Sequence, residues 1–289
     1  NAGTAVNTGN GNVLLGSRAG EKLTNNAANV VVGRAALATA DAGENYNIVI
    51  GGDAATALNN GSATYNILIG QDAGTGGTGA MASCVAIGGN AMNSTGGNAQ
   101  TGTIAIGHNA LTALTSGGEN MAIGYEAMKA MTTGGANIAI GYQTMDALNH
   151  ADADANIAIG NNVLGTVGAQ ALHSCVGIGH GALDAVNHAV AAGVIAIGRD
   201  ALGQLTNGDG NTAIGYEAAK TVQGGSQNTV VGYEALEDGD VSHMTMFGYR
   251  AGQSINSADA KGSVGIGVSA LTSITSGQGN VAIGSGSLA

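Results

Sequence analysis

The sequence has no proline, no tryptophan and a single phenylalanine, and charged residues make up only 9% of its 289 residues. An ordinary globular domain carries about 25% charged residues. Lysine and arginine together number 8, so the net charge of −11 excludes the basic footprint of a nucleic-acid-binding protein. No run of about 18 apolar residues is present, and we therefore expect no membrane insertion.

Residues that carry chemistry are also scarce. Cys84 and Cys175 are too few for a disulfide scaffold and too far apart for a CxxC motif, so we expect free, buried thiols. The six histidines show no HxxxH or HExxH spacing, and no phosphate loop or nucleophile elbow is visible. We therefore predict no catalytic residue, no metal site and no cofactor, and a protein that is not an enzyme.

Glycine, in contrast, is abundant, with 52 copies, and many of these close a repeated motif such as Asn137-Ile-Ala-Ile-Gly-Tyr142. We use this glycine as a marker and number each repeat from it. The sixteen markers follow one another at spacings of 16 to 19 residues: Gly16, Gly33, Gly51, Gly70, Gly88, Gly107, Gly124, Gly141, Gly160, Gly179, Gly198, Gly215, Gly232, Gly248, Gly267 and Gly284. A fixed period of this kind indicates a solenoid. We predict one continuous array over residues 1–289, without a domain boundary.

The residues before the marker form a strand signal. Position −3 is β-branched in every repeat except at Met121, position −1 is Ile, Leu or Val except at Phe247, and position −2 is usually small. Alternation of this kind predicts a short strand, and because both faces are apolar we expect the strand to be covered on both sides.

Position −4 is asparagine in most repeats. Stacked coils would align these side chains into a ladder of amide hydrogen bonds. The column comprises Asn12, Asn29, Asn47, Asn66, Asn120, Asn137, Asn156, Asn211, Asn228 and Asn280.

After the marker, apolar residues recur at positions +3, +4 and +7, which lie on one face of a helical turn. Glu126 and Glu217, at the start of this segment, also fit a short helix. We predict a parallel β-solenoid, a β-helix or β-roll, of about sixteen coils, each with a short strand and a short helical or extended leg. A curved, leucine-rich-repeat-like α/β solenoid is the alternative, because helices about 10 Å across cannot stack at the strand spacing of about 4.8 Å.

The first and last repeats show no polar cap of the kind that solenoids normally need. We expect an array that is uncapped at both ends, either a piece of a longer fibre or a subunit that stacks head to tail.

A few surface residues suggest binding or chemistry. Tyrosine recurs at position +1, as Tyr125, Tyr142, Tyr216, Tyr233 and Tyr249, and such a stripe could contact glycans or simply cover a corner of the coil. Glu217 and Glu234 lie in adjacent coils at a spacing that suits a retaining glycosidase, although acids recur at this position throughout the repeat. Thr115, Thr132 and Thr206 do not form the unbroken column that ice binding would need.

The motif Asn-x-Ala-Ile-Gly-Tyr-x-Ala-Leu resembles repeats of phage tail-fibre and bacterial surface-fibre proteins, and is similar to the head repeats of trimeric autotransporter adhesins. The resemblance spans Asn12 to Ala289. It implies a left-handed parallel β-roll, trimeric assembly and an extracellular location, although the coils of those heads are shorter than these.

These observations predict a non-enzymatic structural subunit of an extracellular fibre, on a virion or a cell surface. Its partner would be further copies of itself, as a homotrimer or a head-to-tail filament. An adhesin that recognises surface glycans is the first alternative, and a polysaccharide depolymerase is the second.

Overall fold

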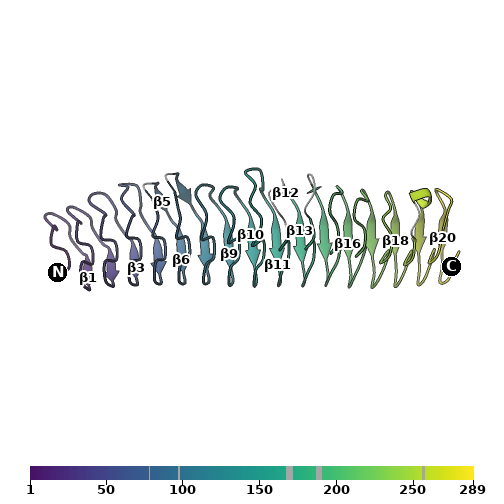
Figure 1. Ribbon diagram of the computed structural model, residues 1–289, viewed down its shortest axis with the longest axis horizontal. Helices are drawn as coiled ribbons and strands as arrows, with labels where there is room; N and C mark the ends of the chain where they lie inside the picture. The colour runs from purple at the N-terminus through teal and green to yellow at the C-terminus, as the bar shows by residue number, and fades with distance from the viewer. Residues whose placement is uncertain (78, 97, 167–171, 187–190, 256–257) are drawn as a thin grey trace. The chain divides into compact units, whose positions relative to one another are not determined.

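A computed structural model describes residues 1–77, 79–96, 98–166, 172–186, 191–255 and 258–289, and it is a parallel β-solenoid. The chain divides into two compact units, Asn1–Asp146 and Ala147–Ala289. In each unit one short strand per coil pairs in parallel and in register with the strand of the next coil. Figure 1 shows these main strands side by side in chain order within each unit. The predicted solenoid is therefore confirmed.

The main strands lie directly before the marker glycines. In the first unit they are β1 (Val13–Leu15), β2 (Val30–Val32), β3 (Ile48–Ile50), β4 (Ile67–Ile69), β6 (Val85–Ile87), β8 (Ile104–Ile106), β9 (Met121–Ile123) and β10 (Ile138–Ile140). In the second unit they are β11 (Ile157–Ile159), β13 (Val176–Ile178), β15 (Ile195–Ile197), β16 (Thr212–Ile214), β17 (Thr229–Val231), β18 (Thr245–Phe247), β19 (Val264–Ile266) and β20 (Val281–Ile283).

Two short pairs of strands lie outside this main row. In the first unit β5 (Met81–Ala82) pairs with β7 (Gln100–Thr101), and in the second unit β12 (Leu172–His173) pairs with β14 (Ala191–Ala192). One 3₁₀ turn, η1 (Ala258–Ala260), lies between β18 and β19.

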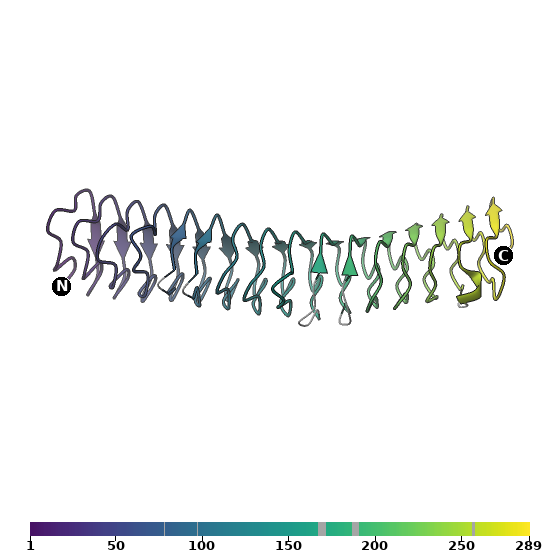
Figure 2. The same cartoon turned by 90° about the horizontal axis from the view of Figure 1, so that it is seen from above.

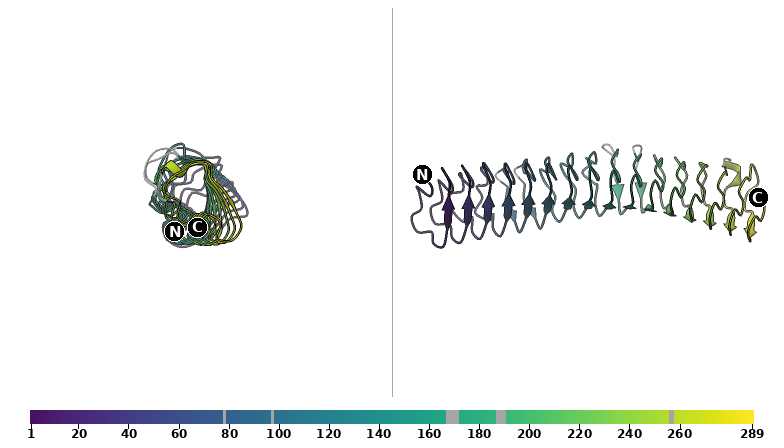
Figure 3. Two further views of the ribbon diagram at one scale, coloured as in Figure 1. Left: turned by 90° about the vertical axis from the view of Figure 1, so that its right-hand side faces the viewer. Right: turned by 90° about the horizontal axis from the view of Figure 1, so that it is seen from below.

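The sequence left the leg either helical or extended, and the structure does not have the helical form. Among the described residues no α-helix occurs, and positions +2 and +4 of every coil have left-handed φ angles, for example 57° at Glu126 and 50° at Met128. A right-handed helix cannot contain such residues, so the leg is a tight turn. The leucine-rich-repeat alternative required a helix in each coil and is therefore wrong. Figures 2 and 3 show each coil of a unit as a slender loop beside the next.

The apolar residues at +3, +4 and +7 of the leg nevertheless lie on one side of it and point into the coil, as their spacing predicts. Ala127, Met128 and Met131, at +3, +4 and +7 of one coil, are fully buried, and so is Ala122 at the middle of the strand. These side chains fill the space inside the coil, where burying aliphatic carbon contributes about 25 cal/mol per Å². The core is thin because one coil encloses only a few such side chains.

Asparagines at −4 hold successive coils together. The backbone N–H of Asn47 donates to Oδ1 of Asn29 at 2.9 Å, and Nδ2 of Asn47 donates to the carbonyl of Ala63 in the following coil, also at 2.9 Å. In the second unit the N–H of Asn228 donates to Oδ1 of Asn211 at 3.0 Å. These side chains therefore bond to backbone polar groups of the coil that follows them, and most of the column is buried.

Both cysteines occupy this asparagine column. Neither forms a disulfide and both are buried, and the N–H of Cys84 donates to Oδ1 of Asn66 at 2.9 Å. A thiol is a weak hydrogen-bonding group, and Cys84 continues the ladder only through a long hydrogen bond from Sγ to the carbonyl of Gln100 in the next coil, at 3.5 Å. The Thr103 hydroxyl, which occupies the column one coil further on, is buried without a hydrogen-bond partner.

The marker glycines allow the backbones of neighbouring coils to approach closely. Gly124 has a φ of 141°, and a Cβ placed on it would lie 2.1 Å from the carbonyl oxygen of Gly141. Any larger residue would both clash and occupy a region of φ that is almost restricted to glycine.

This close approach makes Gly124→Ala strongly destabilising. We expect a loss of about 3 kcal/mol or more in the free energy of unfolding, measured by chemical denaturation, because strain and steric overlap add. Gly52→Ala is the matched control, since a Cβ on Gly52 meets nothing within 4 Å. Equal losses in the two variants would show that the marker glycine is not a packing constraint.

Candidate functional site

The outward sides of the main strands form a largely apolar surface in each unit, which we call the aliphatic face. It consists of the side chains at −3 and −1, whereas the residue between them points into the coil and is buried in every main strand except β1. Ile48 and Ile50 are 38% and 37% exposed, and Phe247 is 58% exposed. The strand is therefore covered on one side only, and its second apolar side faces solvent in the single chain.

No charged residue occurs at −3 or −1 in any coil. In the second unit the face changes character over three adjacent strands, where Thr212, Thr229 and Thr245 pair in register at −3. Soluble monomers rarely expose a large contiguous apolar patch, so this surface is a candidate interface.

The tyrosines predicted as a surface stripe lie at +1, beyond the marker glycine. Their rings stack on one another: Tyr125 on Tyr142 with 5.3 Å between ring centroids, and Tyr233 on both Tyr216 at 4.8 Å and Tyr249 at 5.6 Å. Such offset pairs stabilise the stacking of coils by about 0.5–1.5 kcal/mol each.

Basic side chains extend these stacks. His108 stacks on Tyr125 at 5.6 Å, the Arg199 guanidinium lies 5.7 Å from the ring centroid of Tyr216, and that of Arg250 lies 5.0 Å from the ring centroid of Tyr249. The ring faces in these columns therefore largely contact neighbouring side chains.

A second aromatic pair lies at −5, on the other side of the aliphatic face, and the sequence reasoning missed it. Tyr46 and Tyr65 stack at 4.9 Å with ring planes 3° apart. They are also the most exposed tyrosines, at 52% and 61%. The one available signal was their identical place directly before Asn47 and Asn66 in adjacent coils.

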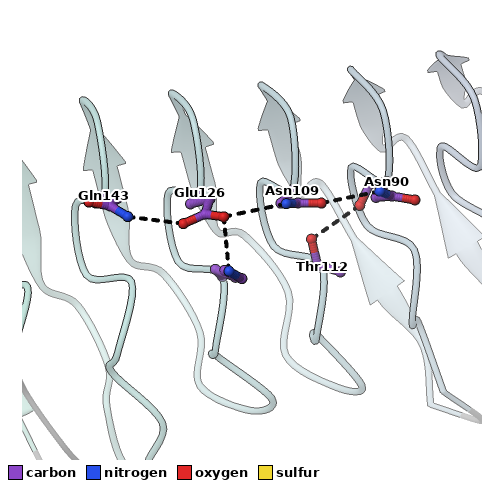
Figure 4. A network of polar contacts seen from close by, with 6 residues as sticks. Asn90, Asn109, Thr112, Glu126 and Gln143 are labelled. Carbon is purple, nitrogen blue, oxygen red and sulfur yellow. Dashed lines mark hydrogen bonds and ion pairs between the residues drawn. The ribbon is translucent and has the colours of Figure 1, made fainter.

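Polar side chains at +2 and +5 form a network along the first unit (Figure 4). Glu126 accepts hydrogen bonds from Lys129 Nζ at 2.9 Å and from Gln143 Nε2 at 3.0 Å. Asn109 Nδ2 lies 3.5 Å from the same carboxylate, and Asn90 donates to Asn109 at 3.2 Å. The hydrogen bond from Lys129, followed by that from Gln143, lowers the pKa of Glu126 to about 2.

The suggested glycosidase pair is engaged in equivalent contacts. Glu217 lies 3.2 Å from Lys220, and the Arg250 guanidinium donates to Glu234 at 2.6 Å. Burial acts to raise the pKa of Glu217, but hydrogen bonds from Tyr216 and Lys220 outweigh it, so the pKa is lowered. A glycosidase acid needs a raised pKa, and Glu217 therefore does not suit that role.

Glu44 is a carboxyl group of a different kind, fully buried inside the first unit. Its Oε2 accepts from Asn26 Nδ2 at 2.6 Å, whereas Oε1 has no partner. Burial raises the pKa of Glu44. The group lies in the interior of the coil, where a ligand has no access, and we assign it a structural role.

Other polar residues stabilise neighbouring coils. The Thr115 hydroxyl donates to the carbonyl of Thr132 at 2.9 Å, and Thr206 donates likewise to Gln223 at 3.0 Å. Asp240, which lines an open groove of the second unit with Asp238 and Ser254, accepts backbone hydrogen bonds from three successive residues, 223 to 225, through a single carboxylate oxygen.

Within the described ranges, no group of three or more His, Cys, Asp or Glu residues is placed to hold a metal ion. In the same part of the chain, no helix has the length and apolar character needed to cross a membrane. No protein-family model and no curated protein matches the chain. Any functional conclusion therefore depends on the surfaces described above.

The lowered pKa of Glu126 has a consequence for stability. Its contribution is fully present above the ordinary pKa of 4.5 and is lost as the pH falls towards about 2, because the unfolded chain takes up the proton first. We expect the free energy of unfolding of Glu126→Gln to change less between pH 4.5 and 2 than that of the unsubstituted protein.

Lys129→Gln is the companion variant, since it keeps the carboxyl group but removes its first partner. It should reduce the same pH dependence, as measured by urea denaturation at a series of pH values. A pH dependence that is identical in all three proteins would contradict the assignment.

Proposed function

We propose that this chain is a non-enzymatic structural segment of an extracellular fibre, and that copies of it assemble through the aliphatic face. The observation that carries the proposal is the exposed, uncharged double row of Ile, Val and related side chains along the main strands of each unit. Burying such a surface stabilises an assembly roughly in proportion to its area, and a row that extends over many coils supplies a large area.

The regularity of the face supports a second copy as its partner. Every coil presents the same two positions, and the strands of each unit are in register. Two copies can therefore repeat one contact at each coil spacing, which is how stacked sheets of identical segments associate. The resemblance of the repeat to surface-fibre proteins supports the extracellular location and the fibre.

The proposal predicts that charges on the aliphatic face disrupt assembly. We expect the unsubstituted protein to be an oligomer by light scattering, and Ile48→Lys together with Ile104→Lys to reduce its mass to that of the 27.8 kDa chain. Lysine at these positions would have to enter an apolar interface, where an unpaired charge is costly.

Ala57→Lys together with Asn59→Lys is the control, because it adds the same charge at exposed positions of the leg. This variant should keep the oligomeric mass, and circular dichroism should show the same fold for all three proteins. An unsubstituted protein that is monomeric would refute the proposal, and electron microscopy of the oligomer distinguishes a homotrimer from a head-to-tail filament.

A further inference from the structure

The tyrosine pair at −5 differs from the columns at +1 in what lies beside its rings. Tyr125 is stacked between His108 and Tyr142, and Tyr233 lies between two tyrosines. Among the described residues Tyr46 and Tyr65 stack only on each other, and each ring therefore has a second face directed away from the pair.

Small residues adjoin the pair on both sides. Backbone hydrogen bonds set the order of the −5 column: Tyr65 bonds to the coil before it through the Asn45 carbonyl, at 3.3 Å, and Ser83 bonds in the same way through the Thr64 carbonyl, at 3.0 Å. The next residue in the column is Gly102, where an added Cβ would meet nothing within 4 Å. Beyond Tyr65 the column therefore has only small residues for two coils, a length of about 10 Å at the usual strand spacing.

The arrangement is the same on the other side of the pair. Ala28 precedes Tyr46 in the column, and Gly11 precedes Ala28. The two rings therefore project beyond the small residues on either side of them in the column. We call the space above those small residues, next to each ring, the notch. The exposed fractions of 52% and 61% agree with this, because the other tyrosines are all below 50% exposed.

The residue type is unusual for the position. Every residue of the −5 column has a left-handed φ, and at Tyr46 and Tyr65 it is 61° and 60°. This conformation is unfavourable for a bulky side chain, and glycine, alanine or serine occupies most of the column. The two tyrosines are therefore unusual among the residues of this column.

We propose that Tyr46 and Tyr65 bind a pyranose ring of a β-linked glycan whose ring substituents are all equatorial, such as a glucose or N-acetylglucosamine unit. Such a ring has only axial C–H bonds on each face, and these pack on the electron-rich face of a phenol. The notch provides the space for the sugar ring, and the Ser83 hydroxyl beside Tyr65 can donate to or accept from a sugar hydroxyl.

This inference goes beyond the proposed fibre, because it needs only the rim of the aliphatic face and not its burial between copies. It also places the glycan contact at residues different from the stripe at +1. In that stripe Tyr125 and Tyr233 each have a ring stacked on both sides, whereas Tyr142 lies at the end of its stack. The rings with two neighbours offer a sugar less surface than Tyr46 and Tyr65.

The test is binding of cellohexaose and chitohexaose to the full chain, followed by saturation-transfer difference NMR and calorimetry. We expect saturation to be strongest on H1, H3 and H5, the axial hydrogens of one face of the sugar. Tyr46→Ala with Tyr65→Ala should weaken binding by about tenfold or more, whereas Tyr46→Phe with Tyr65→Phe should retain it. Alanine already occurs in this column at Ala28 and Ala136 with the same φ, so the alanine variant should fold.

Tyr216→Ala with Tyr233→Ala is the control, because it removes one stacked pair whose rings each have a further ring or guanidinium neighbour, and it should leave binding unchanged. The proposal is overturned if neither oligosaccharide binds, or if both alanine pairs weaken binding equally. It is also overturned if Tyr46→Ala with Tyr65→Ala lowers the oligomeric mass without any change in sugar binding, which would make the pair a contact between copies. The oligomeric mass of the Ile48→Lys and Ile104→Lys variant tests the proposed fibre and not the glycan site, so failure of one proposal can be distinguished from failure of the other.

Discussion

The structure depends on how closely one coil can approach the next. Parallel strands must lie about 4.8 Å apart to form hydrogen bonds, and this spacing must hold at the corners as well as along the strands. At the corner after each main strand the backbones meet at the marker glycines, where a Cβ at Gly124 would overlap the carbonyl oxygen of Gly141. The register of the aliphatic face, the asparagine ladder and the tyrosine stacks all require this spacing.

The architecture was largely predictable, because it follows from a period that the residues repeat many times. The conformation of the leg was not predictable. Apolar residues at +3, +4 and +7 suit either a helical turn or a chain that winds around a narrow core, and Met128 at φ 50° is a residue type that ordinarily favours a helix. Glycine or asparagine would have signalled the left-handed positions, but in most coils other residues adopt that conformation under the constraint of the stacked backbones.

The candidate site was only partly predictable for a related reason. Alternating apolar residues show that a strand has two apolar sides, but not which side the same chain covers. The leg turned out to fold over the side of Ala122 and to leave the sides of Met121 and Ile123 outside. Tyr46 and Tyr65 escaped notice because they occur in two coils only, whereas the +1 tyrosines recur in five.

The asparagine ladder also has a direction. Oδ1 of Asn29 accepts from the backbone of the coil after it, and Nδ2 of Asn29 donates to the carbonyl of Glu44 in that same later coil, at 2.8 Å. The ladder side chains thus bond mainly to the coil that follows them, although Nδ2 of Asn29 also donates back to Oδ1 of Asn12, at 3.2 Å. A ribosome delivers the coils in this order, so each newly completed coil supplies the partners that the previous one lacks. The fold can therefore extend during translation, one coil at a time, from the N-terminal side.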